Sequence, residues 1–120
     1  MYMCMFVLND PDHLDEILEA WNAAGISGAT ILESTGSYRY RANLSKLHLR
    51  FLPEAHQLMS EQFNYTLFVL VPDREQVDTC LHAVEQIIGD LDNPDTGVFA
   101  AWPLEVIKGV PQSLSKERKK

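Results

Sequence analysis

The chain has 120 residues, the length of one domain, and its 46% hydrophobic residues suffice for a core without disulfides or a structural metal. It carries 10 lysine and arginine residues against 17 aspartate and glutamate residues, and the net charge of -7 argues against nucleic acid as a partner. Two cysteines are too few for a disulfide scaffold or a zinc finger.

The N-terminus has no basic segment before its short apolar run, and no stretch of the chain has the length of a membrane span. We therefore expect a cytoplasmic protein that does not insert directly into a membrane. Residues 113–120 form a polar tail that we expect to be frayed, so the predicted domain covers residues 1–112.

The first part of the chain predicts a strand, a helix and a second strand. Residues 2–8 form a continuous apolar run, which is typical of a buried strand. Asp12 is the predicted cap of the helix that follows, and Gly25 is its predicted end. Residues 29–34 alternate in part between apolar and polar side chains, which predicts a half-exposed strand.

The second part of the chain predicts the same order of elements. Residues 65–71 form another apolar run, and Asp73, with a glutamine three positions later, has the spacing of a capping box. The helix that begins there is predicted to end at Gly89. Residues 90–96 are rich in turn-forming residues, and residues 98–102 predict a last apolar strand.

Two strand–helix–strand units predict a ferredoxin-like α+β sandwich, a four-stranded antiparallel sheet with its first and third strands at the centre. Two helices cover only one face of such a sheet, so the other face should carry polar residues at alternate positions. Residues 2–8, 65–71 and 98–102 do not alternate in this way. We therefore expect further copies of the chain to cover the second face, in preference to a monomer with a loop folded across it.

Residues 36–64 form an excursion much longer than a usual connection between strands, and such long loops are often functional. No acidic residue lies between Glu33 and Glu54. Four basic residues occupy this stretch: Arg39, Arg41, Lys46 and Arg50. On an otherwise acidic chain, they predict a contact for an anionic ligand or an acidic protein surface. The alternative is that the excursion docks on the acidic body of its own or a neighbouring chain.

Short motifs follow one another along most of residues 2–107. They are Pro11 with His-Leu-Asp-Glu at 13–16, Gly28-Ala-Thr30 with Glu33, Gly36 and Arg39, Phe51-Leu52-Pro53, Val71-Pro72-Asp73, and Pro103-Leu104-Glu105. Their order and spacing resemble the nitrogen-regulatory PII signalling family. This resemblance implies a ferredoxin-like homotrimer that is not an enzyme. Such a protein binds ATP or ADP, or another small anionic effector, between its subunits and regulates an enzyme or a membrane transporter through a long T-loop.

The resemblance also implies site residues. The positions that match the family's nucleotide cleft are Thr30, Gly36, Arg39 and Gly97. Arg39 would pair with an anion there, and the glycines would let the backbone approach it. Within the T-loop match, the candidate partner-binding residues are Tyr38, Tyr40, Arg41, Lys46 and Arg50.

The sequence departs from the family at the phosphate-binding positions. Val98 stands where the family has a lysine, and Lys108 is the one basic residue in a region where the family has two arginines. A phosphate site without these cations loses its main charge-assisted contacts, so we expect no tight binding of ATP.

Two other functions stay open at this stage. A CutA-like trimer linked to metal tolerance would hold a metal through His48 and His56, but their spacing matches no closed metal site. A small ferredoxin-like enzyme would need polar side chains pointing into its core, where the apolar helix faces offer only Cys80. We expect Cys4 and Cys80 to be buried, inert thiols, although the sequence does not exclude a disulfide between them.

Overall fold

The computed structural model describes residues 1–37, 40–41 and 63–110. Four strands, β1 (Tyr2–Leu8), β2 (Thr30–Ser34), β3 (Asn64–Val71) and β4 (Gly97–Pro103), form a sheet in the order β2-β3-β1-β4. Every pair of neighbouring strands is antiparallel. The predicted central positions of the first and third strands are confirmed, and the small α+β arrangement is compatible with a ferredoxin-like fold.

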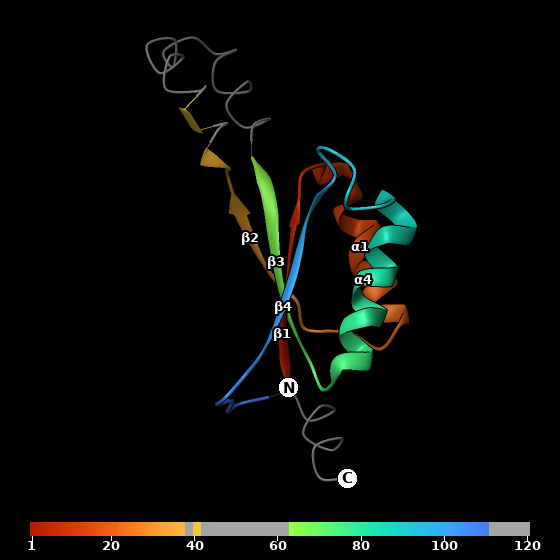
Figure 1. Ribbon diagram of the computed structural model, residues 1–120, viewed down its shortest axis with the longest axis vertical. Coiled ribbons are helices and arrows are strands. Elements are labelled where there is room, and N and C mark those ends of the chain that lie inside the picture. Colours follow the sequence, from red (N-terminus) through yellow and green to blue (C-terminus); the bar gives the residue numbers. More distant parts are fainter. Residues whose placement is uncertain (38–39, 42–62, 111–120) are drawn as a thin grey trace.

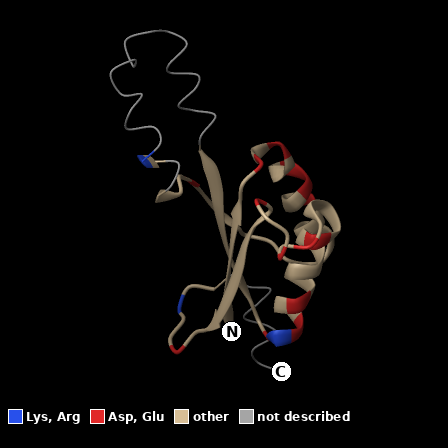
Figure 2. Cartoon of the chain, turned by 45° about the horizontal axis from the view of Figure 1, so that its top comes forward, with Lys and Arg blue, Asp and Glu red and all other residues tan. Residues whose placement is uncertain are grey.

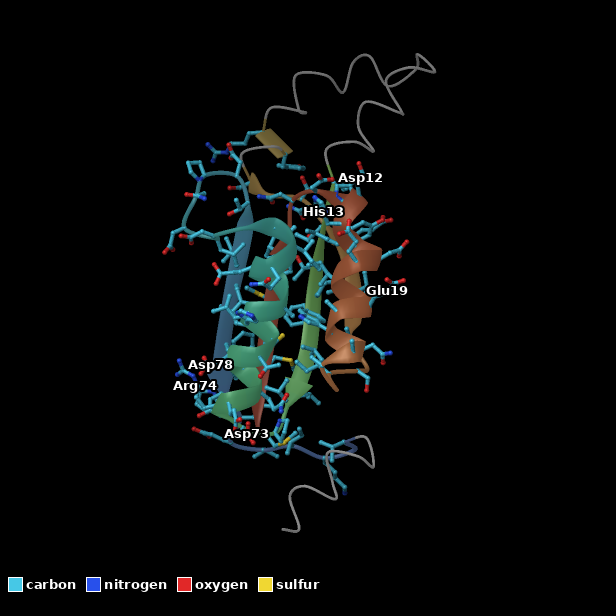
Figure 3. All side chains as sticks on the ribbon, turned by 90° about the vertical axis from the view of Figure 1, so that its right-hand side faces the viewer. Asp12, His13, Glu19, Asp73, Arg74 and Asp78 are labelled. Atoms are coloured by element: carbon cyan, nitrogen blue, oxygen red, sulfur yellow. The ribbon has the colours of Figure 1, made fainter. Side chains whose placement is uncertain are left out.

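Two helices, α1 (Leu14–Ala23) and α4 (Arg74–Ile88), pack against the same face of this sheet, as Figure 1 shows. They lie side by side and run in opposite directions, since Asp12 lies at one end of the pair and Asp73 at the other (Figure 3). Inside, the indole Nε1 of Trp21 on α1 donates a hydrogen bond to the backbone oxygen of Cys80 on α4 at 3.2 Å. This bond joins the two helices within the core.

The core lies between the helices and alternate residues of the two central strands. Cys4 pairs with Val69 and Phe6 with Leu67, so these four side chains share the face of the sheet that the helices cover. All four are buried, with at most 2% of the surface of any of them exposed. Ile17, Trp21, Val77, Cys80 and Val84 complete the core from the helices.

The start of the first helix differs from the sequence prediction. Asp12 is not the cap; the Oδ1 atom of Asp10 accepts a hydrogen bond from the backbone N–H of Asp12 at 3.0 Å. The reason is a 3-10 turn, η1 (Pro11–His13), which precedes α1 and has the proline in its first position. Proline is favoured there because it has no N–H to leave unpaired, and this moves the cap to the residue before it.

The other predicted helix ends are confirmed. Asp73 Oδ1 accepts a hydrogen bond from the backbone N–H of Gln76 at 2.9 Å at the start of α4. Gly25 and Gly89, which follow the two helices, have φ angles of 84° and 96°. The predicted loop 90–96 is a series of turns, in which the Thr96 hydroxyl donates to the backbone oxygens of Leu91 and Asn93.

Most of the predicted excursion, and the tail at 113–120, lie outside the described residues. The two ends of the excursion are described, because Ser34 closes β2 and Asn64 opens β3. These two residues are register partners. The chain therefore leaves the sheet and re-enters it at the same end.

Candidate functional site

The face of the sheet that α1 and α4 do not cover is here called the open face. Met3, Met5 and Val7 alternate with the buried residues of β1, so they point to this side. The register adds residues from the other strands, and the apolar members of the open face are Met3, Met5, Val7, Leu32, Phe68, Leu70, Val98, Ala100 and Trp102. Trp102 is 40% exposed and Val98 56%. The sequence expectation that these strands are apolar on both faces is confirmed.

A polar cluster, Ser34, Asn64 and Thr66, closes one end of the open face. The hydroxyl of Ser34 lies 2.8 Å from that of Thr66 and also donates to the side-chain oxygen of Asn64. Asn64 is 6% exposed and Thr66 9%, whereas Ser34 is half-buried. The sequence analysis missed this cluster; its one signal was that residues 64 and 66 place polar side chains at alternate positions of an otherwise apolar strand.

The effector residues expected from the resemblance lie on opposite edges of the sheet. Thr30 begins β2, and Gly36 follows the end of the same strand. Gly97 begins β4, at the other edge. Three strand spacings separate the two edges, which is about 14 Å. One chain therefore does not bring Gly97 together with Thr30 and Gly36, and Arg39 lies outside the described residues.

Gly97 also has a packing role of its own. Its φ of 142° lies in the region that side chains rarely adopt, and a Cβ atom at this position would lie 2.5 Å from the backbone oxygen of Val7. The close approach of β4 to β1 thus requires glycine here whether or not a ligand binds. The role of Gly97 in effector binding stays a prediction.

A cavity of about 370 Å³ lies beside Gly97, between the end of α4 and the start of β4. Its lining is formed by Leu81, Glu85, Leu91, Asp92, Gly97, Val98 and Phe99. The charged groups of this lining are carboxylates, and Oε2 of Glu85 accepts a hydrogen bond from the backbone N–H of Leu91 at 3.0 Å. An anion in this cavity would need basic groups from elsewhere, because the described lining supplies none.

Acidic residues lie along both helices, as the red segments of the cartoon in Figure 2 show. Arg74 is a basic exception at the start of α4, where its Nε donates to Oδ1 of Asp78 at 3.4 Å (Figure 3). Both side chains of this pair are more than 60% exposed, so it adds little to stability. The described part of the chain is therefore an acidic body, as the sequence predicted.

Two of the five expected partner-binding residues are described. Tyr40 and Arg41 are both exposed, and the backbone N–H of Tyr40 donates to the backbone oxygen of Gly36 at 2.9 Å. This bond lies just beyond the end of β2, where the excursion begins. The remaining candidates, Tyr38, Lys46 and Arg50, lie outside the described residues, as do His48 and His56.

Both cysteines lie in the core. Cys4 on β1 and Cys80 on α4 are free and have no exposed surface. A hydrogen bond from the Cys80 thiol lowers the pKa of Cys4, although burial opposes this shift. The same hydrogen bond and burial raise the pKa of Cys80. The expectation that both thiols are buried is confirmed.

Over residues 1–37, 40–41 and 63–110, no three acidic, histidine or cysteine side chains come together in a way that could hold a metal ion. No helix in these segments has both the length and the apolar character needed to cross a membrane. No known protein-family model matches the sequence. A search of curated proteins also gave no match.

Proposed function

We propose that the protein is a PII-like signal-transduction protein, a ferredoxin-like homotrimer that binds a small effector in clefts between its subunits. Through the excursion between β2 and β3 it regulates a partner, which is an enzyme or a membrane transporter. Regulation of nitrogen utilisation is the process that the sequence resemblance suggests. In this proposal the protein acts in the cytoplasm and is not itself an enzyme.

The observation that carries the proposal is the open face. Its apolar side chains come from all four strands. The exposed fraction is 40% for Trp102 and 56% for Val98. An apolar surface that continues across a whole sheet favours contact with another protein surface. A further copy of the same chain presents the same apolar face, and closed symmetric assemblies of identical chains are the most common kind.

The separation of the expected effector residues supports a site made by two subunits. Thr30 and Gly36 belong to the β2 edge and Gly97 to the β4 edge of one sheet. In a closed ring, the β2 edge of one copy faces a different edge of its neighbour, so these positions come together only between chains. Such a cleft would combine Gly97 of one subunit with Thr30, Gly36 and Arg39 of the next.

The chemistry of the cleft favours an effector other than ATP. The described cavity beside Gly97 contributes the carboxylates of Glu85 and Asp92, and Val98 stands in place of the family's lysine. Each lost charge-assisted hydrogen bond to phosphate costs roughly 1.5–3 kcal/mol. Two such losses weaken a micromolar site to about millimolar. A smaller anion that needs only Arg39 fits the remaining residues better.

The charges of the excursion support its role in partner binding. The excursion carries basic residues, whereas the two helices are rich in acidic ones. The basic residues are Arg39, Arg41, Lys46 and Arg50. The two ends of the excursion join the sheet at the register partners Ser34 and Asn64, so the chain leaves and re-enters the sheet at the same end. A basic segment of this kind steers association with an acidic surface.

A thermal-shift panel tests the proposed effector site. The panel holds adenine nucleotides, cyclic dinucleotides, 2-oxoglutarate and divalent metal ions. A ligand that binds only the folded protein raises the melting temperature. We expect a small anion to do so, Arg39→Gln to abolish its effect, and the control Arg74→Gln, on the exposed start of α4, to retain it.

Two outcomes of this panel would count against the proposal. A shift caused by divalent metals alone would favour the CutA-like alternative. A rise in melting temperature that persists in the Arg39→Gln variant would show that Arg39 does not contact the anion. Neither the metal-tolerance function nor a ferredoxin-like enzyme is favoured by an observation on the described residues.

A further inference from the structure

A groove runs between α4 and β4 on the helix-covered side of the sheet. It combines the cavity of about 370 Å³ beside Gly97 with a second cavity of about 210 Å³, and both cavities are lined by Leu81 and Phe99. From these shared residues the second cavity continues to Tyr2 and Ala101. The two cavities therefore adjoin, and together they are called the α4–β4 groove.

The groove exists because β4 is an edge strand. The helix α4 packs against the central strands β1 and β3, and Figure 3 shows β4 at the side of α4 that faces away from α1. Ala101 is the register partner of the buried Cys4, so it points to the helix side, and it is nevertheless exposed. Phe99, on the same side of β4, packs against the core. The groove thus has an apolar floor and is open to solvent along its outer side.

The two ends of the α4–β4 groove differ in charge. At the end beside Gly97, the described lining holds the carboxylates of Glu85 and Asp92 and no basic side chain. One oxygen of Glu85 accepts a backbone hydrogen bond, and a carboxylate can accept several more. At the other end, Arg74 is already paired with Asp78. A ligand that matches the whole groove is therefore elongated, with positive charge at the Gly97 end and none at the other.

The sequence of the chain contains a segment with this distribution of charge. Ten residues follow Val110, the last residue that the structure describes. The final eight, residues 113–120, begin with Ser-Leu-Ser and hold four of the ten basic residues of the chain but one acidic residue. Lys116, Arg118 and Lys120 occupy alternate positions, so an extended segment would direct all three to the same side. The segment is thus uncharged where it begins and basic where it ends.

The path of the chain brings this segment to the groove in the required direction. Pro103 is the register partner of Tyr2, so the chain leaves β4 at the Tyr2 end of the groove. Figure 1 shows that the described chain stays at this end of the sheet after β4. The seven residues of β4 measure about 23 Å, and ten extended residues span about 33 Å. A segment that turns back along β4 can therefore reach the carboxylates beside Gly97 with its last residues.

The excursion is the other basic segment of the chain, but its origin suits this groove less well. It begins after β2, at the edge of the sheet opposite to β4, and returns through β3. Residues 113–120, in contrast, follow the strand that itself forms one wall of the groove. Charge attracts both segments to the carboxylates, so connectivity decides between them.

We propose that the α4–β4 groove is a docking site for the chain's own C-terminal segment, residues 113–120, whose basic residues contact Glu85 and Asp92. Single exposed ion pairs are weak, but attachment to β4 keeps the segment at an effective concentration of millimolar order, so several weak pairs act together. Docking should weaken as salt rises. It would also bring basic groups to the cavity beside Gly97, whose described lining has none. Because the contact lies within one chain, it does not depend on the proposed function.

Carbodiimide crosslinking of the full chain at low salt tests the contact. The reagent joins a carboxylate to a lysine amine without a spacer, so it reports groups that touch. We expect peptide pairs that join Lys116, Lys119 or Lys120 to Glu85 or Asp92, and we expect their loss at high salt. Isotope-labelled and unlabelled protein, unfolded and refolded together, show whether both peptides of a pair come from one chain. Methylamine in a parallel reaction verifies that the reagent activates both carboxylates.

Release of the segment by trypsin, which cuts after its basic residues, gives a second measurement with a matched control. Glu85→Gln with Asp92→Asn removes two charges from the groove, and the glutamine keeps an oxygen for the backbone hydrogen bond. Asp15→Asn with Glu19→Gln removes the same charge from exposed positions of α1. At low salt we expect the groove variant to lose the segment several-fold faster than the wild type, and the α1 variant to match the wild type.

Several results would overturn the proposal. One is the absence of crosslinks between the segment and the groove, and another is that its lysines join the carboxylates of α1 equally often. Pairs formed only between different chains would assign the segment to a neighbouring copy, and pairs with Lys46 would assign the groove to the excursion. Equal release of the segment from the wild type and the groove variant would also contradict docking. The wild-type crosslinks decide even if a variant fails to fold, and none of these results depends on the mass of the assembly.

Discussion

Gly97 lies against the backbone of Val7 so closely that a Cβ atom on residue 97 would stand 2.5 Å from the Val7 oxygen. The two residues occupy neighbouring strands, β4 and β1, at the end of the sheet where the cavity beside Gly97 opens. A glycine that the family resemblance assigns to ligand binding is thus also required for the packing of the sheet. The two roles can be separated by experiment.

Gly97→Ala should lower the free energy of unfolding by roughly 1–3 kcal/mol, because the new side chain meets the Val7 oxygen in a strained conformation. Gly36→Ala is the matched control, since a Cβ atom there meets nothing within 4 Å and its φ is ordinary. We expect Gly36→Ala to leave stability nearly unchanged. Urea unfolding measures both variants, and equal stability for the two would show that β4 shifts to accept the side chain.

The cap at the start of the first helix allows a second paired comparison. Asp10→Ala should cost about 1 kcal/mol of stability, because it leaves the backbone N–H of Asp12 without its side-chain acceptor. Asp12→Ala removes a nearby carboxylate that caps nothing, so its effect should be smaller. Thermal unfolding of both variants distinguishes them. A larger loss of stability for Asp12→Ala than for Asp10→Ala would instead support Asp12 as the cap, as predicted from the sequence.

The sequence predicted the strands and helices well where one local signal dominates. The apolar run at residues 2–8 predicted β1 with its observed bounds, and the capping residue Asp73 predicted the start of α4. The cap at Asp10 was missed because two aspartates flank Pro11, and only the 3-10 turn decides between them. Local patterns therefore predict which elements form more reliably than where they begin.

The candidate site was harder to predict because its parts depend on register. Ser34 and Thr66 are far apart in the sequence and meet only because Ser34 pairs with Asn64 across β2 and β3. In the same way, the strand order places Gly97 at the opposite edge from Thr30. The apolar character of both sheet faces was visible in the sequence, because it needs no knowledge of which residues are neighbours.

The excursion offers a prediction about partner binding. Changing Arg41, Lys46 and Arg50 together to Gln should leave the stability of the assembly nearly unchanged, because exposed charges add little to folding. The same change should prevent recovery of a partner in pull-downs from native lysate, and the wild-type interaction should weaken as salt rises. Lys108→Gln, outside the excursion, serves as the control. If the variant instead loses assembly but retains its partner, the excursion docks on the acidic body of its own or a neighbouring chain.

The open face predicts how a single substitution should affect assembly. Trp102→Glu places a carboxylate among the apolar side chains of β1 and β4, where burial against another copy would leave it without a partner. Val106→Glu is the control, because Val106 is 86% exposed and follows the end of β4, beyond the sheet. Both variants add the same charge, so only the position on the open face distinguishes them.

Light scattering on these three proteins at micromolar concentration tests the central claim most directly. The wild type and Val106→Glu should have a mass near three times 13.6 kDa, and Trp102→Glu should dissociate toward a single chain. A stable wild-type monomer of 13.6 kDa, or a trimer that Trp102→Glu leaves intact, would contradict assembly through the open face.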